Sequence, residues 1–94
     1  MQMIDGKKTK RLIEKGALLF DVRDPVSFRD GTLPGAINLT LRQVSTLMKH
    51  DRKVPLIFFG NNNEDVNLRS ILGYASQMGF LNIYSLGSIN NWNV

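Results

Sequence analysis

Hydrophobic residues along the chain gather in short continuous runs, separated by segments with the spacing of amphipathic helices. Two runs, Ala17 to Phe20 and Pro55 to Phe59, are apolar at every position. They lack the alternation of polar and apolar residues that is typical of a strand with one solvent-exposed face. Continuous runs of this kind are typical of strands that are covered on both faces, as in a parallel sheet flanked by helices. We predict five strands. The first ends at Ile4, and the other four cover residues 17–21, 36–39, 55–59 and 82–85.

Two helices are predicted in the first half of the chain. Asp5 is a suitable N-cap for the first, which runs to about Glu14 with Gly16 just beyond its end. Thr40 opens the second, because Gln43 three residues later completes a capping box. The apolar stripe expected on this second helix consists of Leu41, Val44, Leu47 and Met48.

The third and longest predicted helix follows a loop at Gly60 to Asn63 and ends at Gly79. We place Glu64 and Asp65 in its first turn, where the positive end of the helix dipole favours acidic side chains. Gly79 serves as the C-terminal stop. The expected buried face consists of Leu68, Ile71, Leu72, Ala75 and Met78.

Turn-forming residues dominate the stretch before residue 36. Asp24-Pro25 breaks the preceding strand, and Leu33-Pro34-Gly35 fits a type II turn, in which Pro sets φ and Gly tolerates a positive φ. Strands that alternate with helices imply an open parallel α/β sheet of about five strands, flanked by helices on both faces. We expect a single such domain over residues 1–94.

The composition fits a globular domain and removes several kinds of chemistry. None of the 94 residues is cysteine, which excludes disulfides, thiolate metal sites and any sulfur nucleophile. The lone histidine, His50, argues against a zinc site or a serine triad, and we interpret it as a surface residue after a helix. No apolar run approaches the roughly 20 residues of a membrane span, and the N-terminus has no signal-like apolar region. We therefore expect a cytoplasmic protein without a metal or cofactor.

Positive charge is concentrated in the first half of the chain. Residues 1–53 hold eleven Lys/Arg against six Asp/Glu, whereas residues 54–94 hold one against two. Much of the excess lies on the first predicted helix, where a solvated helix face explains it. No aromatic residue precedes Phe20, so nucleic-acid binding is disfavoured. Electrostatic docking of this helix to an acidic surface or nucleic acid stays open as a weaker alternative.

Three segments of the chain form a combined pattern. They are Asp21-Val22-Arg23-Asp24 followed by Phe28, Gly31 and Leu33-Pro34-Gly35-Ala36-Ile37-Asn38-Leu39; the strand 56–59 leading to Arg69-Ser70; and Gly79-Phe80 followed by Ile83-Tyr84-Ser85-Leu86-Gly87 and Trp92. Together these segments make the chain resemble the rhodanese homology domain over nearly its whole length. The resemblance implies the fold expected above and, in active members, thiosulfate sulfurtransferase chemistry on a cysteine that directly follows the apolar strand.

The chain departs from this family where the family's chemistry takes place. Gly60 matches the position of the nucleophile, so the covalent step has no atom on which to occur. The family arginine matches Arg69 only with a shift of about three positions, and Thr32 stands where the family usually has histidine. Acidic residues after Gly60 also disfavour an incoming anion. The vestigial active-site loop consists of Gly60, Asn61, Asn62, Asn63, Glu64 and Asp65.

Five signature residues are expected to be structural: Asp21, Arg23, Phe28, Gly35 and Trp92. Asp21 and Asp24 resemble an acid/base pair by spacing, but capping of turns explains them better. Arg23 is placed to satisfy carboxylates or loop carbonyls, and the two aromatic residues to anchor loops. For the asparagines of the loop we favour αL turn geometry over presentation of their amides to a partner.

Two further hypotheses follow from an intact scaffold without its nucleophile. The first is a catalytically inactive domain that acts as a regulatory or interaction module and contacts an unknown protein partner through the loop. The alternative is a protein whose loop at 60–66 still binds a small anion or sulfur donor, and which works with a partner that supplies the thiol. The first predicts no sulfurtransferase activity, whereas the second predicts anion binding at the loop.

Overall fold

The computed structural model describes residues 1–94 and contains one five-stranded, all-parallel sheet. Its strand order is β1-β5-β4-β2-β3, so β4 lies at the centre. The predicted open parallel α/β sheet is therefore confirmed. The strands are β1 (Gln2–Met3), β2 (Leu18–Asp21), β3 (Ile37–Asn38), β4 (Leu56–Gly60) and β5 (Ile83–Ser88).

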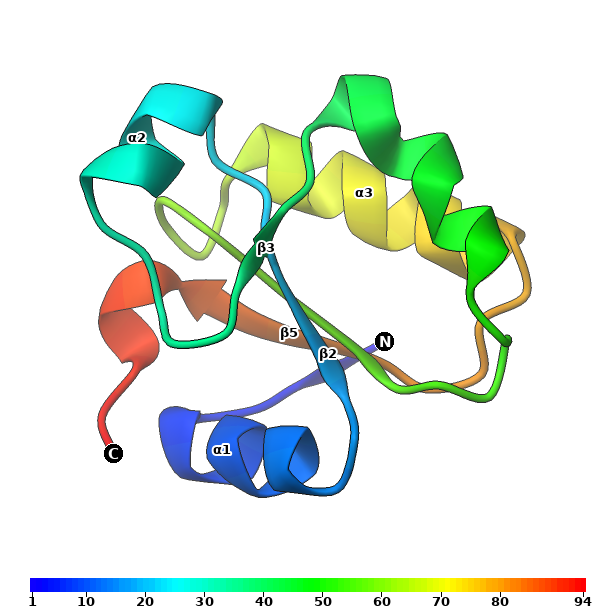
Figure 1. Cartoon of the computed structure of the whole chain (residues 1–94), viewed down its shortest axis with the longest axis horizontal. Helices are drawn as coiled ribbons and strands as arrows, with labels where there is room; N and C mark the ends of the chain where they lie inside the picture. Colours follow the sequence, from blue (N-terminus) through cyan, green and yellow to red (C-terminus); the bar gives the residue numbers. More distant parts are fainter.

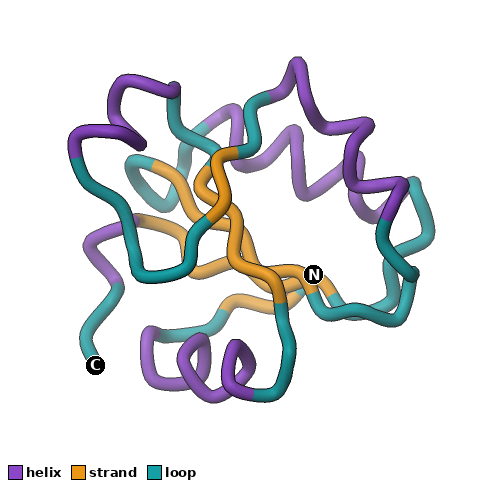
Figure 2. Tube along the Cα trace, in the orientation of Figure 1, coloured by secondary structure: helices purple, strands orange, loops and turns teal.

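Helices cover both faces of this sheet (Figure 1). On one face lie α3 (Val66–Gln77) and the 3₁₀ helix η1 (Leu41–Lys49), and on the other lies α1 (Gly6–Glu14). The short helices α2 (Pro25–Asp30) and η2 (Ile89–Asn91) lie at the end of the sheet where β2 and β5 finish (Figures 1 and 2). None of these helices is both long and apolar enough to cross a membrane.

The alternating side chains of β4 divide the core into two clusters. Leu56 and Phe58 join the cluster under α3 and η1, while Ile57 and Phe59 join the cluster that faces α1. All four side chains are completely buried. Complete burial of such a side chain stabilises the fold by about 1.5–3 kcal/mol, so a polar substitution at Phe58 would disrupt the sheet at its centre.

The stretch after β2 differs from the prediction, which had only turns there. Asp24 accepts hydrogen bonds from the Ser27 N–H and hydroxyl, and Pro25 occupies the first helical position of α2. Proline at that position costs nothing, because the N–H it lacks would have no intrahelical partner. The residues interpreted as a strand breaker therefore also begin a helix. The turn at Leu33-Pro34-Gly35 is confirmed, with Gly35 at φ 78°.

The second predicted helix is present and has its capping box, but it is a 3₁₀ helix. Its period of three residues per turn aligns Val44 and Leu47 toward the core and turns Met48 away from it. Met48 is 59% exposed and Leu41 is 37% exposed, so the prediction that both belong to the buried stripe was wrong.

Candidate functional site at the carboxyl edge of the sheet

The conspicuous sequence segments meet at one edge of the molecule. In a parallel sheet the carboxyl ends of the strands share one edge, where ligands of open α/β folds bind. Here the ends of β2, β4 and β5 bring together the turn after Asp21, the loop after Gly60 and the η2 segment after Ser88. Figure 1 shows α2, the connection from β4 to α3, and η2 side by side at this edge.

Asp21, at the end of β2, is a fully buried carboxylate with a complete set of partners. Arg23 contributes its backbone N–H and, from the guanidinium, a short contact of 2.8 Å between Nη2 and Oδ2. Thr32 donates its hydroxyl to the same Oδ2 at 2.7 Å. The hydrogen bonds to Asp21 raise the pKa of Arg23 above its usual value. Buried charges persist in proteins when they are paired in this way.

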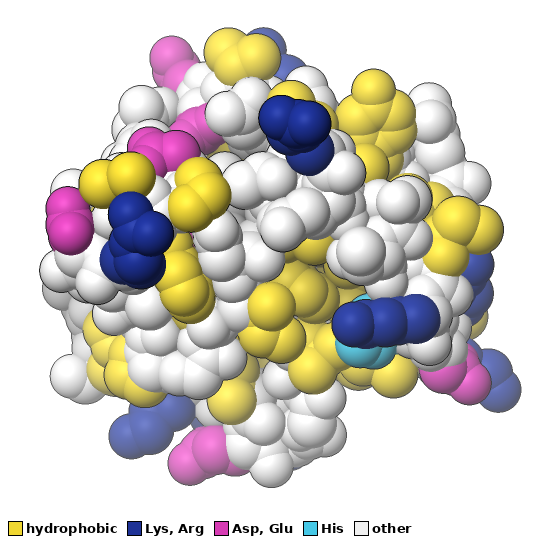
Figure 3. Space-filling model, turned by 45° about the horizontal axis from the view of Figure 1, so that its top comes forward, with side chains coloured by type: hydrophobic (Ala, Val, Ile, Leu, Met, Phe, Trp, Pro, Cys, Tyr) yellow, Lys and Arg dark blue, Asp and Glu magenta, His cyan; other side chains and the backbone are white.

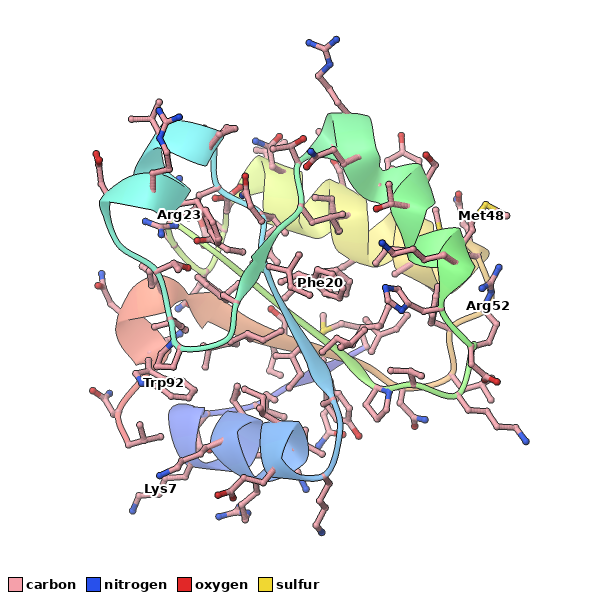
Figure 4. The ribbon with its side chains drawn as sticks, viewed as in Figure 1. Lys7, Phe20, Arg23, Met48, Arg52 and Trp92 are labelled. Carbon is pink, nitrogen blue, oxygen red and sulfur yellow. The ribbon has the colours of Figure 1, made fainter.

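The same turn is tied to its neighbours through backbone carbonyl groups. Arg23 also donates from Nη2 to the Gly31 carbonyl oxygen at 2.6 Å. The amide of Asn38, on β3, donates to the carbonyl oxygens of both Asp21 and Arg23. Figure 4 shows Arg23 reaching from the end of β2 toward the segment below α2. This geometry agrees with a structural role for Asp21 and Arg23.

The remaining signature residues lie in less specific surroundings. Phe28 is half-buried on α2, and Trp92 is half-buried and packs against the core cluster that faces α1. In Figure 4, Trp92 lies between η2 and the beginning of α1. Asp24 does not pair with Asp21 and instead caps α2; its pKa is lowered by hydrogen bonds from the Ser27 backbone and side chain. No acid/base pair exists at this edge.

Gly60 is the last residue of β4 and is buried, rather than lying in a loop as predicted. It pairs with Ser88 in the register between β4 and β5. A Cβ atom added to Gly60 would lie 2.6 Å from Oδ2 and 2.9 Å from Cγ of Asp65. Real Cβ atoms do not approach other atoms this closely. The Asp65 carboxylate therefore occupies the space that a side chain on Gly60 would require.

Asp65 is held in this place by backbone N–H groups on both sides of it. Oδ2 accepts a hydrogen bond from the Asn61 N–H at 3.0 Å, and Oδ1 accepts from Asn67 and Leu68 at 2.9 and 3.2 Å. Donors at a helix N-terminus are those that would otherwise bind an external anion. Asp65 is thus an internal anion, and it is the N-cap of α3. The prediction that Glu64 and Asp65 lie in the first helical turn was wrong, because both precede Val66.

Two of the loop asparagines hold the loop in place through their side chains. Asn62 Oδ1 accepts from the Glu64 N–H, and Asn63 Oδ1 accepts from both the Ser88 N–H and Asn91 Nδ2, each at 2.9 Å. No residue other than glycine has a positive φ, so the predicted αL geometry of the asparagines was wrong. The hydrogen bonds to Ser88 and Asn91 were not anticipated. The sequence carried no signal for them, because the Ser88 donor is a backbone N–H and Asn63 and Ser88 lie 25 residues apart.

No group of three or more His, Cys, Asp or Glu side chains in the structure could hold a metal ion. The edge therefore contains a structural ion pair, a capped helix and a loop closed by its own hydrogen bonds. The only histidine, His50, lies away from it at the end of η1, half-buried and edge-on to the Phe20 ring, rather than as a simple surface residue.

Comparison with known proteins agrees with this architecture. Residues 5–94 match the model of the rhodanese-like domain family. The thiosulfate sulfurtransferase GlpE of Pseudomonas aeruginosa strain LESB58 is 31% identical over 96 residues, covering 97% of this chain and 83% of that protein. GlpE of Pseudomonas syringae pv. syringae is 29% identical over 94 residues, covering 95% of this chain and 84% of that protein.

Solved structures share the fold at lower sequence identity. The Alr3790 protein of Anabaena sp. has a TM-score of 0.82 at 20% identity, covering 95% of this chain and 83% of that one. A rhodanese-related protein of Thermoplasma volcanium has a TM-score of 0.78 at 18% identity, covering 98% and 90%. With the family match across residues 5–94, these findings establish that the chain belongs to the rhodanese-like domain family and is a member without any cysteine.

Proposed function

We propose that this chain is a non-catalytic rhodanese-like module that binds a protein partner through the carboxyl edge of its sheet. The observation that carries the proposal is the position of Asp65, whose carboxylate fills the space beside Gly60 and accepts the surrounding N–H groups. Beside Gly60 there is no nucleophile, and three backbone N–H groups around it already donate to the Asp65 carboxylate.

The missing thiol has a large energetic consequence. Removing the nucleophile from an enzyme with a covalent intermediate lowers turnover by roughly six orders of magnitude. No cysteine elsewhere in the sequence can take over the step. We therefore expect no transfer of sulfur from thiosulfate to cyanide, and a rate typical of a cysteine-bearing relative would contradict the proposal.

Free amide groups at the same edge support the binding of a partner. The side chains of Asn61, Asn67 and Asn90 are exposed and form no hydrogen bond within the chain. The charged residues from 54 to 94 are Glu64, Asp65 and Arg69, so the loop between β4 and α3 itself carries carboxylates only. Exposed amides with a carboxylate among them suit a polar protein surface that carries Lys or Arg.

The alternative, in which the loop binds a sulfur donor and a partner supplies the thiol, needs the same N–H groups to be free. Asp65 takes three of them, and a second anion beside its carboxylate would be repelled. The geometry therefore favours the module over the anion site. Thiosulfate-dependent amide shifts at residues 60–66 of the unaltered protein would reverse this preference.

Cysteine substitutions distinguish the effect of the missing nucleophile from the effect of Asp65, which fills the space beside Gly60. We expect Gly60→Cys alone to be less stable and inactive, because its Cβ would meet Asp65. In Gly60→Cys/Asp65→Gly the thiol gains both space and donors, so any recovered sulfurtransferase activity should appear only in this double variant. A stable Gly60→Cys protein with full activity would show that Asp65 does not occupy the nucleophile's place.

Partner binding is tested by comparison of matched variants. The loop variant Asn61→Ala/Asn67→Ala/Asn90→Ala removes the three free amides and leaves every hydrogen bond of the folded chain in place. The control, Lys7→Ala/Lys10→Ala, alters the exposed face of α1 on the far side of the sheet. A partner recovered by the unaltered protein and by the control should be lost by the loop variant. Loss with the control alone would favour electrostatic docking through α1 instead.

A further inference from the structure

A hollow of about 250 Å³ lies between the edge strand β3 and η1, away from the loop after Gly60. Its floor is apolar and its rim is polar. Figure 3 shows it as a yellow depression on the face displayed, with the cyan histidine and a basic side chain at its margin. The lining residues are Phe20, Ile37, Asn38, Leu39, Gln43, Thr46, Lys49 and His50.

The floor of this hollow is part of the buried core. The ring of Phe20 is buried and stacks on Phe58 with a centroid distance of 5.3 Å. His50 contacts the same ring edge-on, at 6.4 Å between centroids. Figure 4 shows Phe20 between β2 and η1. Because Phe20 and Leu39 keep only 2% and 3% of their surface exposed, the apolar surface open to a ligand is mainly that of Ile37, which is 46% exposed.

The helical period of η1 arranges its polar side chains along the hollow. With three residues per turn, side chains three positions apart lie above one another. Gln43, Thr46 and Lys49 share this spacing, and all three line the hollow, whereas Val44 and Leu47 pack on the core. In an α-helix, with about 3.6 residues per turn, each of these three side chains would be rotated around the axis relative to the one before it. The 3₁₀ form therefore gives the site a continuous polar wall.

The polar wall of the hollow contains basic side chains and no acidic ones. The lining includes Lys49 and His50 and no Asp or Glu, and Lys49 forms no salt bridge. The carbonyl oxygens of Met48 and His50, at the end of η1, accept hydrogen bonds from Arg52. Their negative potential is offset by that guanidinium, and Gln43 keeps its amide N–H₂ free because its Oε1 faces Thr40.

We propose that this hollow binds a small organic carboxylate with an apolar body, a property beyond the interaction role proposed above. The apolar body would lie on Ile37, above the buried Phe20 and Leu39, and the carboxylate would face Lys49 and the Gln43 amide. The volume is below the 300 Å³ or so of drug-sized pockets, so the ligand is about the size of benzoate. A ligand of this size binds in the millimolar range.

The experiment is an amide-shift titration of the full chain with sodium benzoate, benzamide and sodium acetate. Benzoate should give saturable shifts at Ile37, Leu39, Thr46 and His50. Benzamide lacks the charge and acetate lacks the apolar body, so each should bind at least about fivefold more weakly than benzoate. Equal binding of all three probes, or benzoate shifts confined to α1, would overturn the proposal.

Variants at the exposed wall test the assignment without disturbing the core. Lys49→Met should weaken benzoate about tenfold and leave benzamide unchanged, whereas the control Lys10→Met on α1 should change neither. Thr46→Trp should fill the hollow and abolish the benzoate shifts. If Thr46→Trp folds and still binds benzoate like the unaltered protein, the ligand lies elsewhere and the proposal is wrong.

Discussion

Two aspartates at the carboxyl edge of the sheet, Asp21 and Asp65, are held in different ways. Asp21 is buried and is held by the side chains of Arg23 and Thr32 as well as by a backbone N–H. Asp65 is half-exposed and is held by backbone N–H groups alone. The first joins several elements of the scaffold, whereas the second fills the space beside Gly60, which we propose as the equivalent of the family's nucleophile position.

The two aspartates differ in how many elements of the fold depend on them. The ion pair at Asp21 joins β2 to the segment at Gly31 and Thr32, so its loss affects several elements at once. The loop at Gly60 has to satisfy only its own backbone groups, and one carboxylate does so without a bound anion. The network at Asp21 is therefore independent of the loop at Gly60, which fits the proposal of an intact scaffold with a closed site.

Removal of the Asp21 carboxylate should have the largest effect. Asp21→Ala leaves the Arg23 guanidinium without its counter-charge in a mostly buried position, and breaking such a pair costs about 3–5 kcal/mol. We expect a loss of unfolding free energy in this range, measured by urea denaturation. The control Asp30→Ala removes an exposed carboxylate that forms no hydrogen bond in the structure, and should cost little. An effect of Asp21→Ala no larger than that of the control would remove the distinction between the two aspartates.

Removal of the Asp65 carboxylate should have an intermediate effect. Asp65→Ala takes away the N-cap of α3, which is worth about 1–2 kcal/mol, and water can reach the N–H groups that it frees. Glu64→Ala is the matched control. Hydrogen exchange of the Asn61, Asn67 and Leu68 amides should accelerate in the Asp65 variant only. Unchanged protection at all three amides would contradict the role assigned to this carboxylate.

Loss of the Asn63 side chain should lower the unfolding free energy less than loss of the Asp65 side chain, because Asn63 bridges two loops through an uncharged amide. Asn63→Ala removes hydrogen bonds to the Ser88 N–H and the Asn91 amide, and we expect a loss of about 1 kcal/mol in unfolding free energy. Asn61→Ala, whose side chain forms no hydrogen bond in the chain, is the control. Equal stability of the two variants would show that the connection to Ser88 contributes nothing.

The smallest effect concerns the dependence of stability on pH. Hydrogen bonds from Ser27 lower the pKa of Asp24 in the folded chain. The stabilisation is therefore present at neutral pH and is lost as the pH falls below about 4, through the folded pKa. Asp24→Asn should flatten this part of the stability curve and leave the alkaline part unchanged. An acid limb identical to that of the unaltered protein would contradict the assigned cause.

Much of the fold follows from local features of the sequence. The apolar runs that became β2 and β4 identified strands to within a residue, because a strand buried on both faces must be apolar throughout. The caps at Asp5 and Thr40 identified where helices begin. The helix α2 was missed, because Asp24-Pro25 is equally suited to end a strand and to begin a helix, and six residues show no period.

The site was less predictable, because it depends on the path of a loop. The absence of cysteine and the glycine at position 60 are visible in the sequence. The return of the Asp65 carboxylate to Gly60 is not, since it requires the loop to fold back over five residues. The link from Asn63 to Ser88 joins segments 25 residues apart and has no local pattern.

A thiosulfate titration of the unaltered protein and of Asp65→Ala, followed by amide shifts at Asn61, Asn67 and Leu68, tests the central claim most directly. If the carboxylate already takes the place of the anion, the unaltered protein gives no saturable response at these amides, whereas Asp65→Ala gives one because its donors are free. Saturable binding of thiosulfate at the same amides in the unaltered protein would contradict the claim.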